Sequence, residues 1–273
     1  MSIDITCLCD NNVMLSSHLK GEHGISFYID NGSEVVLFDT GQSFDVLSHN
    51  ANELGIDLRK VEKVVLSHGH YDHTGGLDGL LDLCSPSIYA HPDIFQRKYK
   101  KVDGEEHYIG IPIDRDSIEA RAELFLSKDS LSISDGISTT GEVKRVYAEE
   151  GVPDIFILKE NEDTAKDEIM DDLSLIVKNE KEAMVLLGCN HSGIMNTFTH
   201  VKNLINVPIT TMAGGTHLVA ADEARMNATI GLFRDKEIEI HGFHCTGDEA
   251  SFKMREGIGY AFKRGFVGKT FVI

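Results

Sequence analysis

VEKVVLSHGHYDHTGGL, residues 61–77, contains the most informative pattern in this chain of 273 residues. The apolar run 64–66 predicts a short buried strand, and the glycine pair 75–76 permits a tight turn into a helix. Between them stand four side chains that can bind a metal ion, namely His68, His70, Asp72 and His73. The segment therefore predicts metal ligands at the carboxyl end of a strand.

The spacing of these ligands favours two ions rather than one. His68 and His70 are two residues apart, so in an extended chain they point to the same side and can close on one ion. Asp72 and His73 follow the bend and can serve a second ion, roughly 3.5 to 4 Å from the first as in two-metal hydrolytic sites. Imidazole and carboxylate together suit zinc, manganese or iron better than calcium or magnesium. A surface loop that is merely rich in histidine is the alternative, but the flanking strand and glycine turn argue against it.

The composition excludes several classes of partner. The hydrophobic fraction of 41% and the charged fraction of 26% are those of a soluble globular protein. A net charge of -18 argues against nucleic acid and implies that an anionic substrate needs metal, local basic residues or backbone amides. The apolar runs are too short for a membrane span, and the N-terminus does not resemble a signal peptide. Five scattered cysteines indicate reduced thiols and a cytoplasmic location.

Apolar patterns along the rest of the chain predict alternating strands and helices. Residues 93–165 are the least informative part, and the acidic segment Asn161–Asp172 is expected to be a solvated loop. The glycines of Gly214-Gly215-Thr216-His217 suggest a loop that faces phosphate. Residues 25–29 and 35–38 are expected to form a hairpin with an Asn-Gly turn. The other expected strands are 3–9, 64–66, 87–90, 155–158, 173–177, 183–187, 208–212, 238–240 and 265–273. The expected helices are 43–54, 77–83, 192–204, with Ser192 as its cap, and 226–233.

Further motifs accompany the first one: FDTGQS at 38–43, GCNHSG at 188–193, GGTHL at 214–218 and HCTG at 244–247. The segment SHGHYDH resembles a metal-binding motif of the metallo-β-lactamase superfamily. Together the motifs resemble the subfamily of dihydropterin-methyl-(ribofuranosyl)aminobenzene phosphate synthases. The resemblance implies an α/β fold, a four-layer αββα sandwich in which helices flank two mixed sheets, formed by residues 1–273 as a single domain.

The resemblance also extends the set of ligands. It implies that His244 completes the site of Asp72 and His73, and we favour His191 as the third imidazole beside His68 and His70. Cys189 stands where most members carry a bridging aspartate. An alternative alignment therefore gives the place of the third histidine to Asp171 or Asp172. We expect Cys189 to be a packed thiol beside the ligands, although a thiolate ligand there would favour zinc.

Other residues receive supporting roles from the same resemblance. Asp39 is expected to orient the ligands through hydrogen bonds. Asn12 and His23 are candidate substrate contacts, as is His217 in the glycine loop. Asp72 and His191 are the expected catalytic residues, with Asp72 as a base for water. We expect His91 to be structural, and His241 not to be a ligand.

Three functions remain open from the sequence. The resemblance implies condensation of hydroxymethyl-dihydropterin diphosphate with an aminobenzene ribofuranoside phosphate, with release of diphosphate. The superfamily chemistry alone suggests a metal-dependent hydrolase of a phosphodiester or lactone. A ligand sensor without turnover is the third hypothesis. The expected cofactor is zinc, as one or two ions, with manganese or iron as alternatives; the expected partner is a small phosphorylated or pterin-like molecule, and assembly into homo-oligomers is left open.

Overall fold

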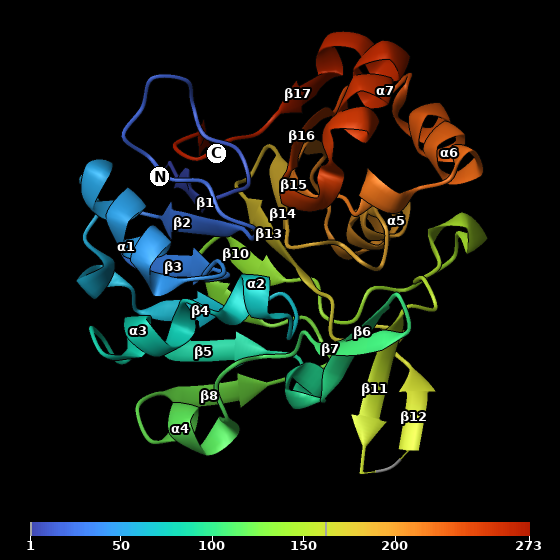
Figure 1. Cartoon of the computed structure of the whole chain (residues 1–273). Helices are drawn as coiled ribbons and strands as arrows, with labels where there is room; N and C mark the ends of the chain where they lie inside the picture. Colours follow the sequence, from blue (N-terminus) through green and yellow to red (C-terminus); the bar gives the residue numbers. More distant parts are fainter. Residues whose placement is uncertain (1, 162) are drawn as a thin grey trace.

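The computed structural model describes residues 2–161 and 163–273, and its two large sheets pack face to face (Figure 1). The first sheet has the order β18-β1-β2-β3-β4-β5-β8. It is mixed, because β1, β2 and β3 pair antiparallel while β3, β4, β5 and β8 pair parallel. Its strands are β1 Asp4–Cys9, β2 Ser26–Asp30, β3 Val35–Phe38, β4 Lys63–Val65, β5 Ser87–Ala90, β8 Glu123–Leu126 and β18 Thr270–Val272.

The second large sheet has the order β17-β16-β15-β14-β13-β10-β9 and is also mixed. Strands β14 to β17 pair parallel, and β13 pairs antiparallel with β14 and β10. Its strands are β9 Ser132–Ser134, β10 Ile137–Thr139, β13 Ser174–Lys178, β14 Ala183–Leu187, β15 Ile209–Gly215, β16 Glu239–Phe243 and β17 Phe262–Arg264.

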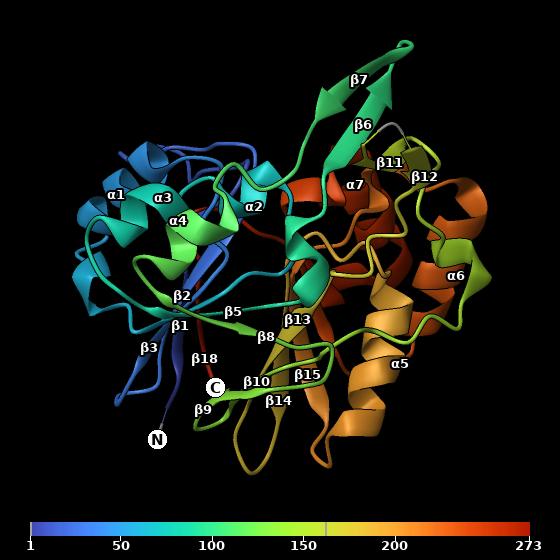
Figure 2. The same ribbon diagram turned by 90° about the horizontal axis from the view of Figure 1, so that it is seen from below.

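Helices cover the outer face of each large sheet, as Figure 2 shows, so the predicted four-layer αββα sandwich is confirmed. One apolar cluster fills the space between the two sheets and includes Phe27, Phe38 and Phe243. Two further clusters lie beneath the two helical layers. Each fully buried Leu or Phe in these clusters contributes about 1.5–3 kcal/mol through burial. The helices are α1 Phe44–Glu53, α2 Tyr71–Thr74, α3 Leu77–Leu81 and α4 Arg115–Glu119 in the first layer, and α5 Ile194–Leu204, α6 Glu223–Phe233 and α7 Asp248–Ile258 in the second. None of the helices in the described part of the chain has the length and apolar character needed to cross a bilayer.

A third, four-stranded sheet stands at one end of the sandwich, and its β6–β7 hairpin extends beyond the body in Figure 2. Its order is β12-β11-β6-β7, with antiparallel pairing throughout. The segment that follows β7 contacts the histidine-rich turn. The N–H of Tyr71 donates to the carbonyl of Ile109, and His70 forms an isolated β-bridge with Gly110. The strands are β6 Lys98–Val102, β7 Glu105–Tyr108, β11 Phe156–Glu160 and β12 Asp163–Lys166.

Most of the predicted elements are confirmed, including the hairpin of β2 and β3 and the pairing of β13 with β14. The prediction of a solvated loop over Asn161–Asp172 is wrong in part: most of its described residues are exposed as expected, but some form a strand and others are buried, and residue 162 lies outside the described residues. Residues 163–166 form β12, and Asp167, Asp171 and Asp172 are buried. Burial is tolerated there because a buried lysine and backbone N–H groups satisfy the carboxylates.

Two local predictions are also corrected. Ser192 does not cap α5, because the helix begins after Gly193 and the Ser192 hydroxyl donates to Asp172. The carboxylate of Glu150 instead accepts from two N–H groups in the first turn of the helix, those of Met195 and Asn196, at 2.9 and 2.7 Å.

The glycine pair at 214–215 is not part of an open loop. Both residues belong to β15, where a Cβ on Gly214 would lie 2.1 Å from the carbonyl oxygen of Leu187. Their lack of a side chain serves the close packing of β15 against β14.

Candidate metal centre

The first group of potential ligands comes from two turns, and each turn follows a strand of a different large sheet. His68 and His70 follow β4 of the first sheet, and His191 follows β14 of the second. One nitrogen of each ring lies within 4.8 Å of the others, and all three residues are buried. The Nε2 of His68 and the Nδ1 of His70 are 2.9 Å apart. The predicted trio of imidazoles is therefore brought together by the fold.

The second group lies beside the first and contains Asp72, His73, Cys189 and His244, whose ligand atoms also lie within 4.8 Å of one another. The Oδ2 of Asp72 is 3.2 Å from the Nε2 of His244 and 3.6 Å from that of His73. The Sγ of Cys189 is 3.2 Å from the Nε2 of His73 and 3.3 Å from that of His244. Cys189, which the sequence placed beside the ligands, thus lies among them.

The donor set fits a divalent metal. The Nε2 of His70 and both ring nitrogens of His191 are buried and have no hydrogen-bond partner among the described residues. Burial lowers the pKa of His70 to about 3 and holds the pKa values of His68 and His191 well below the ordinary value. These three rings are therefore neutral at neutral pH, which is the form that binds metal. A bound ion would supply the partner that these nitrogens lack.

Charge is distributed differently in the second group. Burial alone would lower the pKa of His73, but Asp39 and Asp72 outweigh it and raise the pKa to about 9. Burial would raise the pKa of Asp72, but His73 and His244 hold it well below its ordinary range. Burial raises the pKa of the Cys189 thiol well above 9.0. A cation at this group would therefore compete with the His73 proton and favour the thiolate of Cys189.

Asp39 holds the first motif in place, as its expected role requires. Its Oδ2 lies 2.6 Å from the Nδ1 of His73, so the ring can present Nε2 to a metal. Its Oδ1 accepts from the backbone N–H of Ser67 at 2.7 Å, and Oδ2 also accepts from the Ser67 hydroxyl. Gly188 packs against these hydrogen-bonded groups, and a Cβ on Gly188 would lie 2.2 Å from the Ser67 Oγ. The glycine before Cys189 is thus required for the two ligand-bearing turns to meet.

Three of the site residues hold the backbone in the left-handed region that favours glycine. Asp39, His217 and His244 have φ values of 58°, 48° and 45°. Such conformations cost of order 1–3 kcal/mol each and concentrate at functional sites. They indicate that the surrounding structure fixes these side chains in position.

The candidate substrate contacts lie at unequal distances from the ligands. His23 is half-exposed and places Nε2 3.3 Å from Asp72 Oδ2. The ring of His217 lies 4.3 Å from that of His191, centre to centre, and burial lowers its pKa to about 4. The Asn12 side chain bonds to Asp10 and Arg264 and lines a cavity of about 270 Å³ that His244 also lines.

The alternative ligands Asp171 and Asp172 belong to neither ligand group. Asp171 accepts from the N–H of Gly69 at 2.8 Å and from Lys98. Asp172 accepts from the N–H of Ser192 at 3.0 Å. Both carboxylates therefore brace the turns that carry the histidines.

Sequence reasoning missed three contributors to the site. Asp10 accepts from the N–H of His244 at 2.6 Å, and Asn11 places Oδ1 2.8 Å from the Nδ1 of that ring. Asp10 directly follows a strand, as Asp39 does, and that position was the available signal. Lys98 gave no such signal, since its acidic partners are distant in the sequence.

His91 is buried and accepts from the N–H of Asp93, in keeping with a structural role. His241 contacts Glu239 and belongs to neither ligand group among the described residues.

Comparison with known proteins agrees with this architecture. Residues 20–164 match the model of the metallo-β-lactamase superfamily, and the chain belongs to that superfamily. Its members use divalent metals, so the protein is a metal-dependent enzyme of this superfamily.

Two curated relatives come from Methanocaldococcus jannaschii. The chain is 30% identical to the 7,8-dihydropterin-6-methyl-4-(β-D-ribofuranosyl)-aminobenzene-5'-phosphate synthase over 98% of its own length and 96% of that protein. It is 32% identical to an uncharacterized protein over 91% of its own length and 92% of that protein. Among solved structures, a metal-dependent hydrolase of the β-lactamase superfamily superposes with a TM-score of 0.84, at 28% identity and 98% coverage of both chains.

Proposed function

We propose that the protein is a metal-dependent transferase that joins hydroxymethyl-dihydropterin diphosphate to an aminobenzene ribofuranoside phosphate. One observation carries the proposal: two adjacent ligand groups, built from three distant turns, occur in a chain that matches the pterin-phosphate synthase over nearly its whole length. The substrates would be small phosphorylated molecules, which the acidic chain can bind only beside cations.

The reaction balances without a further reactant. The amine nitrogen of the aminobenzene forms a bond to the methylene carbon of the pterin, and the bond between that carbon and the diphosphate oxygen breaks. The amine proton leaves to solvent, and diphosphate departs with the bonding electrons. Bound metal would supply a Lewis acid that stabilises the negative charge of the leaving group.

The chain's own side chains would position the reactants. We infer that His68, His70 and His191 hold one ion, and that Asp72, His73, Cys189 and His244 hold another. A thiolate donor at Cys189 favours zinc over manganese or iron. The Phe156 ring lies 5.5 Å from His191 and 6.0 Å from His217, centre to centre, with the rings inclined at 77° and 62°, so an aromatic substrate would meet a cluster of ring faces and edges here.

The test is release of inorganic diphosphate by the purified, metal-loaded protein. We expect release only when both the pterin diphosphate and the aminobenzene ribofuranoside phosphate are present, together with a condensation product by mass spectrometry. His68→Ala should abolish the reaction, whereas His241→Ala, at a buried histidine outside both ligand groups, should retain it. Release of diphosphate that does not require the aminobenzene ribofuranoside phosphate would refute the proposed transferase activity.

A hydrolase is the second candidate, and the structural match to a metal-dependent hydrolase favours it. In that function Asp72 would serve as a base for water, since its carboxylate, a member of the second ligand group, contacts both His244 and His23. Cleavage of a phosphodiester or lactone by the metal-loaded protein, with no acceptor present, would support this reading. Tight binding of a pterin without any product would instead indicate a sensor.

A further inference from the structure

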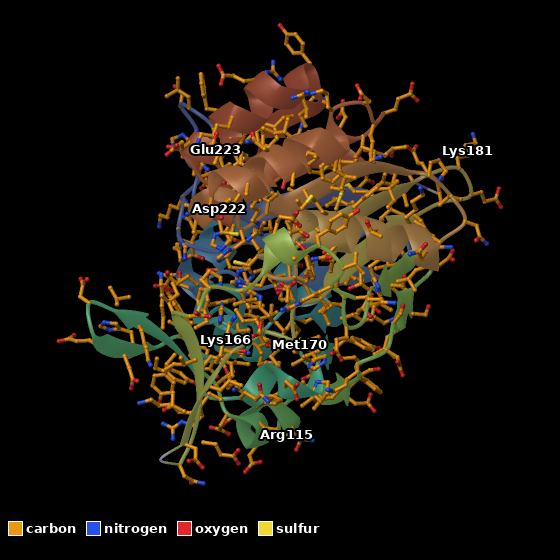
Figure 3. All side chains as sticks on the ribbon, turned by 90° about the vertical axis from the view of Figure 1, so that its right-hand side faces the viewer. Arg115, Lys166, Met170, Lys181, Asp222 and Glu223 are labelled. Atoms are coloured by element: carbon orange, nitrogen blue, oxygen red, sulfur yellow. The ribbon has the colours of Figure 1, made fainter. Side chains whose placement is uncertain are left out.

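The third sheet turns one face toward the metal centre. The ring of Phe156, on β11, lies 5.8 Å from the ring of His70 and 5.5 Å from that of His191, centre to centre. Side chains of a strand alternate between its two faces, so Phe156 identifies the face that contacts the ligands. Figure 3 shows this sheet beside the body, with Lys166 at the end of its strand β12, Met170 beyond it, and Asp222 and Glu223 at the start of α6 above.

The strand register places Lys100 on that same face. Lys100 of β6 lies directly opposite Phe156 of β11, and opposite residues of an antiparallel pair project to the same side. Lys98, two residues earlier, shares this face and is buried against the carboxylate of Asp171. Lys101 projects from the other face and is exposed. One strand therefore carries three lysines in three different environments.

Lys100 differs from Lys98 in its surroundings, which leave its ammonium group available to a ligand. Lys98 forms ion pairs with Asp167 and Asp171 at 3.1 and 2.8 Å. Lys100 is only partly buried, and within residues 2–161 and 163–273 no carboxylate forms an ion pair with it. Lys100 stands opposite Phe156, whose ring lies against the rings of His70 and His191, so the lysine is on the side of the sheet that faces the ligands.

We propose that Lys100 binds a phosphate or diphosphate group of the substrate beside the metal centre. A lysine ammonium is a compact point charge on a flexible stem, and such groups bind phosphate well. The chain carries a net charge of -18, so an anion approaching the centre needs a local cation. The inference rests on the proposed function for the phosphorylated substrate and adds the residue that recognises it.

The test measures binding of inorganic diphosphate to the intact, metal-loaded protein by isothermal titration calorimetry. Lys100→Ala should weaken binding roughly tenfold to a hundredfold, the effect of losing one charge-assisted hydrogen bond. Lys100→Arg should stay within about threefold of wild type, because it keeps the charge. Lys101→Ala is the matched control, since it removes the same charge one residue away on the opposite face, and it should leave the affinity unchanged.

Several results would overturn the proposal. These are unchanged binding in Lys100→Ala, an equal loss in Lys101→Ala, or no binding of diphosphate by the wild type. Metal content and thermal unfolding are measured for each variant, and Lys100→Gln, which keeps a long polar side chain, replaces the alanine variant if that one unfolds. Because the ligand is inorganic diphosphate, binding that depends on Lys100 remains measurable even if no condensation occurs, so the two proposals can fail separately.

Discussion

Replacing Lys98 with methionine tests whether the buried ion pairs of the third sheet support the metal-binding turn. The Lys98 side chain is fully buried, and its Nζ lies 2.8 Å from Asp171 and 3.1 Å from Asp167. Burial alone would lower the pKa of Lys98, but Asp171 and Asp167 outweigh it and raise the pKa. Methionine keeps an unbranched apolar stem, one atom shorter, and removes the ammonium charge together with its hydrogen bonds to Asp167 and Asp171.

The expected loss of stability is large because the partners are also buried. Asp171 is 1% exposed and Asp167 2%, so removal of the ammonium leaves carboxylates without a counter-charge. Breaking a buried ion pair from one side costs about 3–5 kcal/mol. At roughly 2–4 °C per kcal/mol for a chain of this size, the melting temperature should fall by roughly 6–20 °C.

The loss of stability in Lys98→Met should depend on pH, and the substitution should also affect the metal site. Without Lys98 an unpaired carboxylate binds its proton more tightly in the folded state than in the unfolded state, so stability should recover as the pH falls through that raised pKa. Asp171 also accepts from the N–H of Gly69, between His68 and His70. We therefore expect Lys98→Met to lower metal occupancy as well.

The assay is urea unfolding at pH 5 and pH 8, together with elemental analysis of the purified protein. Lys101→Met, on the same strand but exposed, is the control and should change stability by at most about 0.5 kcal/mol. The double variant Lys98→Met/Asp171→Asn should recover part of the loss, since asparagine keeps an oxygen for Gly69. If Lys98→Met unfolds within about 1 kcal/mol of wild type at both pH values, the reasoning about uncompensated buried charge is wrong.

Three further predictions concern the ligands and their supports. His191→Ala should lose the ion of the first group by elemental analysis, while full occupancy would show that His191 is not a ligand. Asp39→Asn should weaken metal binding about tenfold to a hundredfold in a chelator competition, because the His73 ring loses its anionic partner; an unchanged affinity would contradict that role. Burial raises the pKa of Glu150 above its ordinary value of 4.5, so the folded state holds this proton more tightly than the unfolded state. Its contribution to stability should therefore fall as the pH rises from 4.5 through the folded pKa, and Glu150→Gln should flatten that slope in urea unfolding; parallel slopes for the two proteins would refute the assignment.

The parts of the fold that the sequence predicted are those with local signals. The hairpin of β2 and β3 has an Asn-Gly turn between apolar runs, and the ligand motif directly follows an apolar strand. Strands of the second sheet, such as Ala183–Leu187, are continuous apolar runs buried on both faces. In each case the deciding interaction is burial of neighbouring residues, which a pattern in the sequence can report.

Of the third sheet, only β11 was predicted, as the strand expected at 155–158, and its other strands were not predictable in the same way. Strand Lys98–Val102 carries three lysines, and every residue of Glu105–Tyr108 is exposed, so neither shows an apolar pattern. Lys98 is buried only because Asp167 and Asp171 reach it from 69 and 73 residues away. Pairing over such distances depends on the folded topology, which composition does not reveal. The same limit applies to Asn161–Asp172, whose acidity suggested solvent exposure although three of its aspartates face inward.

The buried aspartates explain how three distant turns hold one centre. Each turn that carries ligands donates a backbone N–H to a buried carboxylate of another segment; the pairs are Asp39 with Ser67, Asp171 with Gly69, Asp172 with Ser192, and Asp10 with His244. Burial raises the pKa values of Asp10 and Asp172, so ionised carboxylates here are costly unless positive charge lies nearby. A divalent ion in either ligand group would supply that charge within the same buried region. Metal binding and the rigidity of the turns are therefore expected to stabilise each other, since the carboxylates that fix the ligands are themselves favoured by the ion.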